Sequence, residues 1–530
     1  MLKSFLFVAA TSLIVACGAP VGGREPQPDT DDCVEGATAC VDGLVTVCAD
    51  GVVGAPGPCP DDSVCVADAC EGISPTLQAE LDALDAYATS LRDHGSRAFD
   101  LDDAVAEAKR ALLLTDGGDR DFALAVTTVF LAQTGGHTSL GFGPDDFSAC
   151  GAPDSLYQFT GRTRYGACGR AAGDAVVVSG GDPSNSLGLA VGDRVVSVVK
   201  ANGTAWSSAD LLDKVDHEPL CRASIPNAIA RKDAAASTLF NVIDEGDVLT
   251  VVDVDGVTRA VTAPVRDATP RSCSDPLTRE SRVHVRDVYQ RDDGVVVVVL
   301  PTLGSHPEHP FPAVFSTASY GAWISEGVQG IGDDVSAFDD VTGLVYDLRG
   351  NVGGSAEFGM ALLAQMTDVQ GSIGNCFART AGSDPVSYDD DVEYPFPYAA
   401  LKGASMPAPP ITLLPAGIQQ AVVTDGLTYS AGDWMAYHAH QLGIDVVGTP
   451  AAGAFGYTVG GSFVIEPIAA VGGEHAAIIN FISGAHCVYG AGETSMEGNS
   501  VVDIEVGLDP EDLADGIDTQ LEAAAAAVLQ

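Results

Sequence analysis

The stretch AVVTDGLTYSAGDWMAYHAHQL, residues Ala421–Leu442, is the segment around which the rest of the chain can be organised. An apolar run comes first, a turn-rich segment follows, and apolar side chains with helical spacing begin after Ser430. A strand, a tight turn and a helix would place Ser430 at a helix N-terminus, where free backbone N–H groups and the helix dipole favour negative charge. Ser430 is therefore a candidate nucleophile, and the alternative is a serine that only caps the helix.

A second strand-turn-helix signal lies upstream. Gly294–Leu300 and Gly343–Arg349 are apolar runs typical of buried strands, and the second continues through a glycine-rich turn into the helix expected at Ala356–Met366. At this turn, Gly353 and Gly354 would expose backbone N–H groups that can bind an oxyanion. The alternative is a glycine turn needed only for packing.

The region Ser74–Ala132 has apolar residues at helical spacing and predicts three or four helices. His137 follows them in a loop, between Gly136 and Thr138, where small neighbours would let its ring point into a cleft. A surface histidine with no catalytic role is the alternative.

Residues Phe147–Pro264 are rich in short apolar runs and predict a β domain, with a short helix at Ser208–Val215. The segment LGLAVGDRVVSV, Leu187–Val198, resembles the GLxxGDxIxxV stretch of PDZ domains, which bind peptide C-termini by strand addition. A long insert around Cys221–Ala235 departs from a compact PDZ domain.

Composition limits the possible partners. The 530 residues include 73 acidic and 26 basic side chains, and the formal net charge is −47. Phosphate binding needs clustered Lys and Arg, so nucleic acid is not an expected partner. The 13 cysteines are typical of an exported protein in an oxidising compartment.

The N-terminus predicts export and lipid attachment. A short charged start and an apolar run, residues 1–16, read as a signal peptide. The residues that end in Cys17 resemble a bacterial lipobox, which implies cleavage before Cys17 and a lipid on its sulfur. Gly18 follows instead of aspartate, so we expect a lipid anchor on the cell envelope, at the outer membrane. Ordinary secretion, with Cys17 discarded, is the alternative.

A cysteine-rich module is expected at residues 33–72, after a flexible tether at 17–32. Six cysteines within so short a segment predict three disulfides, which would compensate for a small core. Zinc is the alternative, although no CxxC pair occurs there. The pairing cannot be read from the spacing. Pairing is also expected among the four later cysteines Cys150, Cys168, Cys221 and Cys273.

Several motifs together resemble one enzyme family. LVYDLRGNVGG, Leu344–Gly354, resembles the DLRGNxGG signature of the C-terminal-processing and tricorn-like serine peptidases, family S41. YSAGD, Tyr429–Asp433, resembles that family's nucleophile motif, and Val446–Gly453 resembles the VGxxTxG segment that follows it. The resemblance implies a multidomain α+β chain with a helical region at 74–145, a PDZ-like domain at 146–270 and an α/β peptidase core of the ClpP/crotonase type at 275–530.

The resemblance also implies the catalytic residues. The Ser–Lys branch of the family does not fit, because no lysine follows Lys402. The tricorn and retinoid-binding-protein-like branch uses a histidine and a late glutamate, which would be His137 and Glu497. The motif around His137 lacks the branch's acidic residue, and the one around Glu497 is a residue short and lacks a proline. Glu493 is the alternative acid.

In that arrangement Ser430 is the nucleophile, His137 the base, and Glu497 the group that orients the histidine, directly or through a hydroxyl. Backbone N–H groups of Gly353, Gly354 and Ala431 would form the oxyanion hole. His438 and His440 are alternative bases, but they lie on the helix after Ser430 and would point away.

The sequence therefore predicts an extracytoplasmic serine peptidase that acts on peptides or proteins, without a metal or other cofactor. Two alternatives stay open. One is an inactive S41-like lipoprotein that binds peptides or apolar ligands. The other is a surface adhesion protein that acts through the cysteine-rich module.

Overall fold

The computed structural model describes two compact units, Met1–Ile73 and Ser74–Gln530. The described residues are 38–41, 44–49, 52–53, 63–66, 69–94, 101–115, 118–132, 137–142, 162–181, 185–218, 222–266, 271–272, 287–303, 317–364, 375–378, 392–394, 418–455, 477–481, 485–488 and 496–530. The predicted signal peptide, the tether and Cys17 lie outside them, as do Cys150, Cys221, Cys273 and Glu493.

The described residues of the N-terminal unit form short strands. A three-stranded antiparallel sheet has the order β1-β2-β3, and a separate hairpin pairs β4 with β5. The hairpin register sets Cys65 opposite Cys70. The strands are β1 (Thr38–Val41), β2 (Leu44–Ala49), β3 (Val52–Val53), β4 (Ser63–Val66) and β5 (Ala69–Gly72).

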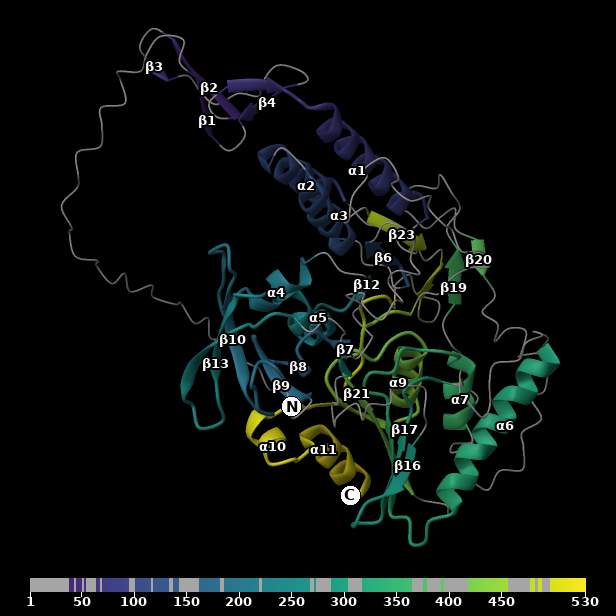
Figure 1. Cartoon of the computed structure of the whole chain (residues 1–530). Coiled ribbons are helices and arrows are strands. Elements are labelled where there is room, and N and C mark those ends of the chain that lie inside the picture. The colour runs from purple at the N-terminus through teal and green to yellow at the C-terminus, as the bar shows by residue number, and fades with distance from the viewer. Residues whose placement is uncertain are drawn as a thin grey trace, which may run out of the picture. The chain divides into compact units, whose positions relative to one another are not determined.

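The second unit begins with three helices, as the helical spacing predicts: α1 (Pro75–His94), α2 (Asp102–Thr115) and α3 (Asp119–Ala132) (Figure 1). Their apolar stripes are buried at Leu84, Leu91, Leu112, Phe122 and Phe130. Within the described part of the chain, no helix is both long and apolar enough to span a bilayer.

The region expected to be PDZ-like forms a sheet with the strand order β14-β13-β10-β9-β8, and β11 pairs with β10. Helices α4 (Leu211–Asp216) and α5 (Ala228–Val242) bury their apolar faces with it. The sequence interpretation of Cys221–Ala235 as an insert was incomplete, because an alanine-rich helix, α5, begins inside it. The strands are β8 (Ala167–Ala172), β9 (Ala175–Gly181), β10 (Arg194–Val199), β11 (Ala205–Trp206), β13 (Val248–Val252) and β14 (Thr258–Thr262).

The core sheet has the order β16-β17-β18-β21-β22-β25, in which only the β16–β17 pair is antiparallel. Its strands are almost wholly apolar because both faces are covered. The strands are β16 (Asp287–Gln290), β17 (Val295–Val299), β18 (Gly343–Asp347), β21 (Gln419–Thr424), β22 (Asp445–Gly448) and β25 (Ile504–Glu505).

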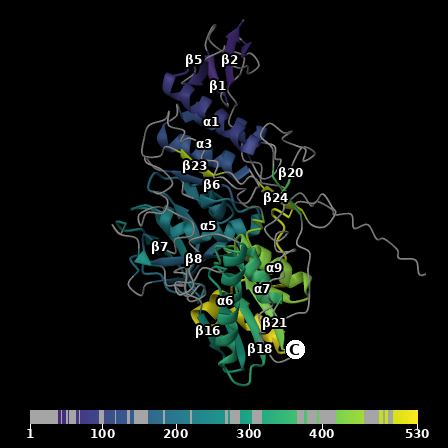
Figure 2. The ribbon, with the colours of Figure 1, turned by 90° about the vertical axis from the view of Figure 1, so that its right-hand side faces the viewer.

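Helices cover the two faces of the core sheet (Figures 1 and 2). One face packs against α6 (Thr317–Ser336), α7 (Ala356–Ala364) and α9 (Ala431–Gln441), and the other against α11 (Thr519–Val528), which follows α10 (Pro510–Ala514). The Arg349 guanidinium connects β18 to α11. It donates hydrogen bonds to Asp347 at the end of β18, and to Asp518 at the start of α11, the latter at 2.7 and 2.8 Å.

Three small sheets connect segments that are distant in sequence. The one that matters for the site has the order β12-β6-β23, in which β6 (Ser139–Phe142) pairs with β12 (Arg222–Ala223) and with β23 (Ala477–Phe481). Strand β6 starts two residues after His137, so this sheet carries the loop of the candidate base toward the core. The other two are β7 (Arg162–Thr163) with β15 (Arg271–Ser272), and β20 (Val392–Tyr394) with β19 (Asn375–Ala378) and β24 (Ala485–Val488).

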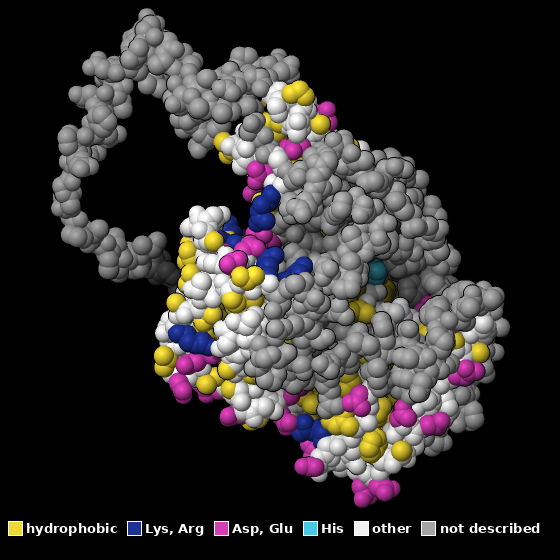
Figure 3. All heavy atoms as spheres, viewed as in Figure 1, with side chains coloured by type: hydrophobic (Ala, Val, Ile, Leu, Met, Phe, Trp, Pro, Cys, Tyr) yellow, Lys and Arg dark blue, Asp and Glu magenta, His cyan; other side chains and the backbone are white. Residues whose placement is uncertain are grey.

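The acidic side chains of the described residues are visible on one face of the molecule (Figure 3). In Figure 3, acidic side chains are scattered over the described part of one face. Cys168, on β8, is disulfide-bonded.

Candidate active site

Ser430 lies between β21 and α9, at the end of the tight turn that the sequence predicts. Its backbone has φ 58° and ψ −114°, a region that residues other than glycine rarely adopt. His137 (φ 61°) and Asp340 (φ 52°) are the other such residues in the described part of the chain. The Ser430 side chain makes no capping hydrogen bond to α9, so helix capping does not explain the serine at this position. Strained conformations of this kind are concentrated at functional sites.

The imidazole of His137 contacts the Ser430 hydroxyl. Its Nε2 atom lies 2.6 Å from Ser430 Oγ, although 293 residues separate the two in sequence. The residue is partly exposed, yet its Nδ1 atom is buried and has no hydrogen-bond partner among the residues that the structure describes. Burial lowers the pKa of His137 to about 4, so the ring is neutral and able to accept a proton at neutral pH.

Among the described residues, Glu497 makes no direct hydrogen bond to His137 Nδ1. It is buried at 2 % exposure, on a turn where the Gly498 N–H donates to the Gly453 carbonyl and the Gly498 carbonyl accepts from Asn227 Nδ2. The His137 Nδ1 atom, which an orienting acid would bind, accepts or donates no hydrogen bond there. The structure therefore brings together two of the three predicted catalytic residues.

The glycine turn lies directly against the nucleophile. A Cβ atom built on Gly353 would be 2.6 Å from Ser430 Cβ and 3.0 Å from its Oγ, so only glycine fits. However, the Gly353 N–H donates to Asn351 Oδ1 at 2.8 Å. The Ala431 N–H opens α9, where the first N–H groups have no acceptor within the helix. Gly354 has φ 129° and lies against the Leu303 carbonyl.

The alternative histidines are engaged elsewhere. His440 Nδ1 lies 2.7 Å from Asp503 Oδ1, and His438 stacks on Trp434 with ring centroids 5.9 Å apart. Burial lowers the pKa of His438 to about 4. Neither histidine bonds to Ser430, as their positions along α9 predict.

Asp433, the last residue of the YSAGD motif, has a role that the sequence interpretation missed. Its buried carboxylate accepts the N–H groups of Gly453 (2.7 Å), Ala454 (3.1 Å) and Ser430. Burial nevertheless raises the pKa of Asp433 to about 7. The carboxylate connects the turn at Ser430 to the VGxxTxG segment. The sequence signal for this role is an acidic residue at the third position of the helix, where capping boxes place one.

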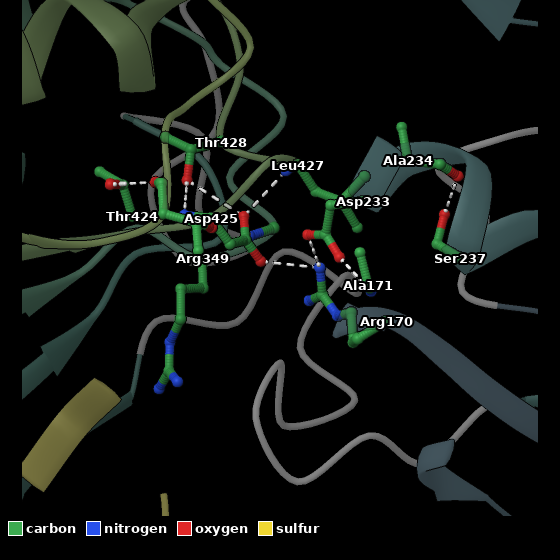
Figure 4. Close-up of polar contacts among 12 residues, drawn as sticks. Arg170, Ala171, Asp233, Ala234, Ser237, Arg349, Thr424, Asp425, Leu427 and Thr428 are labelled. Carbon is green, nitrogen blue, oxygen red and sulfur yellow. Dashed lines mark hydrogen bonds and ion pairs between the residues drawn. The ribbon is translucent and has the colours of Figure 1, made fainter. Parts of the chain in front are cut away.

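A second missed group supports the turn from the β8–β14 sheet (Figure 4). Arg170, on β8, is 3 % exposed and its Nη1 atom lies 2.8 Å from Asp425 Oδ2 and 3.1 Å from Asp233 Oδ2. The other Asp425 oxygen accepts the N–H groups of Gly350 (2.9 Å) and Leu427 (3.0 Å). Asp425 thus supports both the glycine turn and the nucleophile turn, and Arg170 balances its charge.

A cavity of about 340 Å³ opens beside Arg170. Lys232 and Asp233 of α5 line one side of the cavity, and Arg349, Asp425 and Glu505 of the core line the other. Neither Ser430 nor His137 lines it. Among the described residues, no group of three His, Cys, Asp or Glu side chains is placed to hold a metal ion.

Comparisons with known proteins agree with the motifs. Residues 320–463, which include the glycine turn and Ser430, match Peptidase family S41. A structure of mature CPAF complexed with lactacystin aligns with a TM-score of 0.53 at 14 % identity, over 86 % of this chain and 98 % of that one. A CPAF point mutant gives 0.52 at 13 % identity, over 86 % and 97 %. A search of curated protein sequences found no match.

At these identities the alignments establish a shared fold over most of both chains, and the family match lies in the core around Ser430. Family S41 peptidases are serine proteases. The match to Peptidase family S41 covers residues 320–463 of the 530-residue chain.

Proposed function

We propose that this protein is a serine peptidase that cleaves peptide bonds of peptides or proteins through an acyl-enzyme. The observation that carries the proposal is the 2.6 Å contact between His137 Nε2 and Ser430 Oγ, made by two residues that both have left-handed backbones. A neutral histidine at hydrogen-bond distance from a serine hydroxyl is the arrangement that general-base activation requires.

In this mechanism Ser430 Oγ attacks the carbonyl carbon of the substrate and its proton passes to His137 Nε2. The Ala431 N–H, with Gly354, would stabilise the oxyanion, and Gly353 would contribute only after its N–H leaves Asn351 Oδ1. His137 then donates the proton to the amine as the C–N bond breaks. Water hydrolyses the acyl-enzyme by the same route in reverse.

The location belongs to the same proposal. Export, with a lipid on Cys17 and an anchor at the outer membrane, is supported by the N-terminal motif and by the disulfide at Cys168. The β8–β14 sheet would capture the substrate in the manner of a PDZ domain. Glu497 would orient His137 only if it moved to Nδ1 or acted through a hydroxyl.

The decisive experiment is labelling of the folded, full-length protein with a fluorophosphonate probe, followed by mass spectrometry of the modified peptide. We expect the label on Ser430 in the wild type and none on Ser430→Ala. A folded wild type that never reacts would reject the peptidase proposal.

That negative result would instead favour a second candidate, an inactive protein that binds peptides or apolar ligands. Two observations favour this candidate: the Gly353 N–H is occupied by Asn351, and His137 Nδ1 has no partner in the described structure. The same labelling experiment separates the two.

The low pKa of His137 predicts activity that extends to acid pH. A base must be unprotonated, so kcat/KM should fall only as the pH drops through the His137 pKa of about 4. Profiles of kcat/KM between pH 3.5 and 9 would show an acid limb with its midpoint between pH 4 and 5. A midpoint close to 7 would contradict the prediction and indicate that an acid such as Glu497 reaches Nδ1.

Stability must be followed in parallel, because two groups have opposite effects. The pKa of His137 is lowered on folding from 6.5 to about 4, so its contribution to stability increases with pH over that window. The pKa of Asp433 is raised from 3.8 to about 7, so its contribution is lost as the pH rises through that window. Denaturant titrations at each pH would separate loss of activity from unfolding.

A further inference from the structure

Tyr429, the residue before Ser430, contacts all three segments of the proposed catalytic site. Its backbone N–H donates to the Asn351 carbonyl in the glycine turn at 2.8 Å. Its phenolic oxygen accepts the backbone N–H of His137, also at 2.8 Å. Its peptide bond leads directly into Ser430. The nucleophile, the base and the glycine turn are therefore connected through one side chain and its backbone.

The tyrosine ring also limits where the imidazole can lie. The two ring centroids are 5.2 Å apart, with the planes tilted by 51°. Tyr429 itself is 7 % exposed, because it is packed in an apolar cluster with six other buried residues: Ile225, Ala230, Ala234, Leu427, Ala452 and Ala454. A ring held by such a cluster presents its hydroxyl at a fixed position.

Two further features of His137 make this support important. Its left-handed backbone is unfavourable for a residue with a side chain, and its Nδ1 atom lacks the acid that usually orients a catalytic histidine. The carbonyl of the next residue, Thr138, accepts the Ser224 N–H at 2.8 Å. The hydroxyl of Tyr429 fixes the His137 backbone itself.

We infer that Tyr429 is a positioning residue, whose hydroxyl and ring hold His137 at hydrogen-bond distance from Ser430. It does the work that an acid on Nδ1 does in other serine peptidases, but through the backbone and the ring face. This inference rests on the proposed peptidase function.

The test compares Tyr429→Phe with wild type and with a matched control, Tyr165→Phe. Tyr165 is equally buried and its hydroxyl bonds backbone carbonyls of Ile243 and Pro264, away from the catalytic pair. Phenylalanine keeps the ring and removes the acceptor. We expect kcat of Tyr429→Phe, and its rate of labelling by the fluorophosphonate probe, to fall about tenfold while KM stays within twofold. The control should keep kcat within twofold.

Two results would overturn the inference: a Tyr429→Phe kcat within twofold of wild type, or a loss matched by Tyr165→Phe at a similar Tm. Exchange of the His137 amide hydrogen gives a readout that needs no activity, and it should be faster in Tyr429→Phe than in wild type and unchanged in Tyr165→Phe. If the wild type reacts with the probe and His137 exchange is unaffected by Tyr429→Phe, the positioning role fails and the peptidase proposal stands. If the wild type never reacts but exchange accelerates, the peptidase proposal fails, and Tyr429 then only anchors the His137 backbone without serving catalysis.

Discussion

Replacing His137 with alanine should lower kcat/KM by about a thousandfold without unfolding the protein. The expected size comes from the loss of general-base catalysis, which contributes about 10²- to 10⁴-fold in well-positioned sites. The 2.6 Å contact shows that no other group needs to move for His137 to take the Ser430 proton. The structural cost should be small, since the ring is partly exposed and Nδ1 has no partner to leave behind. Steady-state kinetics with a peptide substrate, together with thermal unfolding, would measure both effects.

The matched control is His440→Ala. His440 is a second histidine, and it lies near Ser430 in sequence, at the far end of α9. It pairs with Asp503, so its loss should keep kcat/KM within about twofold. A double variant of Ser430 and His137 should be no slower than the slower single variant, because the two act as one unit. Activity of His137→Ala above a tenth of wild type would show that another group is the base.

The sequence predicted the core strands well because of where they lie. Strands β17, β18 and β21 are buried on both faces, so they appear as continuous apolar runs that periodicity identifies directly. Helix α5 was obscured by the cysteine and prolines before it, although its alanine-rich stretch has high helix propensity. Its burial depends on the β8–β14 sheet, which local patterns do not specify.

The candidate site was predictable to a different degree. Ser430 and His137 were identified through motif resemblance, since no local property of His137 distinguishes it from a surface histidine. The donor direction at Gly353 and the place of Glu497 depend on backbone dihedrals and rotamers, which a motif does not encode. Tyr429 and Arg170 were missed for a related reason: their roles come from contacts between segments that are far apart in sequence, such as the 255 positions from Arg170 to Asp425. Asp433 was missed although its partners Gly453 and Ala454 are only 20 and 21 positions away.

The Arg170 contact leads to the largest expected effect on stability. Replacing Arg170 with methionine would leave the carboxylates of Asp233 and Asp425 buried near each other without a cation, with side-chain exposures of 13 % and 6 %. Breaking a buried ion pair by removing one partner costs about 3–5 kcal/mol. We expect a loss of this size in the free energy of unfolding, measured by denaturant titration. Probe labelling of Ser430 should also slow, because Asp425 supports its turn.

The pH dependence and two further variants test the electrostatic cause. The pKa of Asp233 is already raised, chiefly by burial and further by Asp425, while Arg170 lowers it. Without Arg170 this pKa should rise further, so the variant should regain stability relative to wild type as the pH falls and protonation removes the repulsion.

Adding Asp233→Asn to Arg170→Met should recover part of the lost stability, since it removes one of the two charges. Lys232→Met is the control: this neighbouring cation pairs with Asp174 at an exposed site, where such pairs contribute about 0–1 kcal/mol. Equal losses of stability for Arg170→Met and Lys232→Met, or no recovery of stability with Asp233→Asn, would contradict the prediction. Packing rather than charge balance would then explain the contact between Arg170 on β8 and Asp425 in the turn after β21.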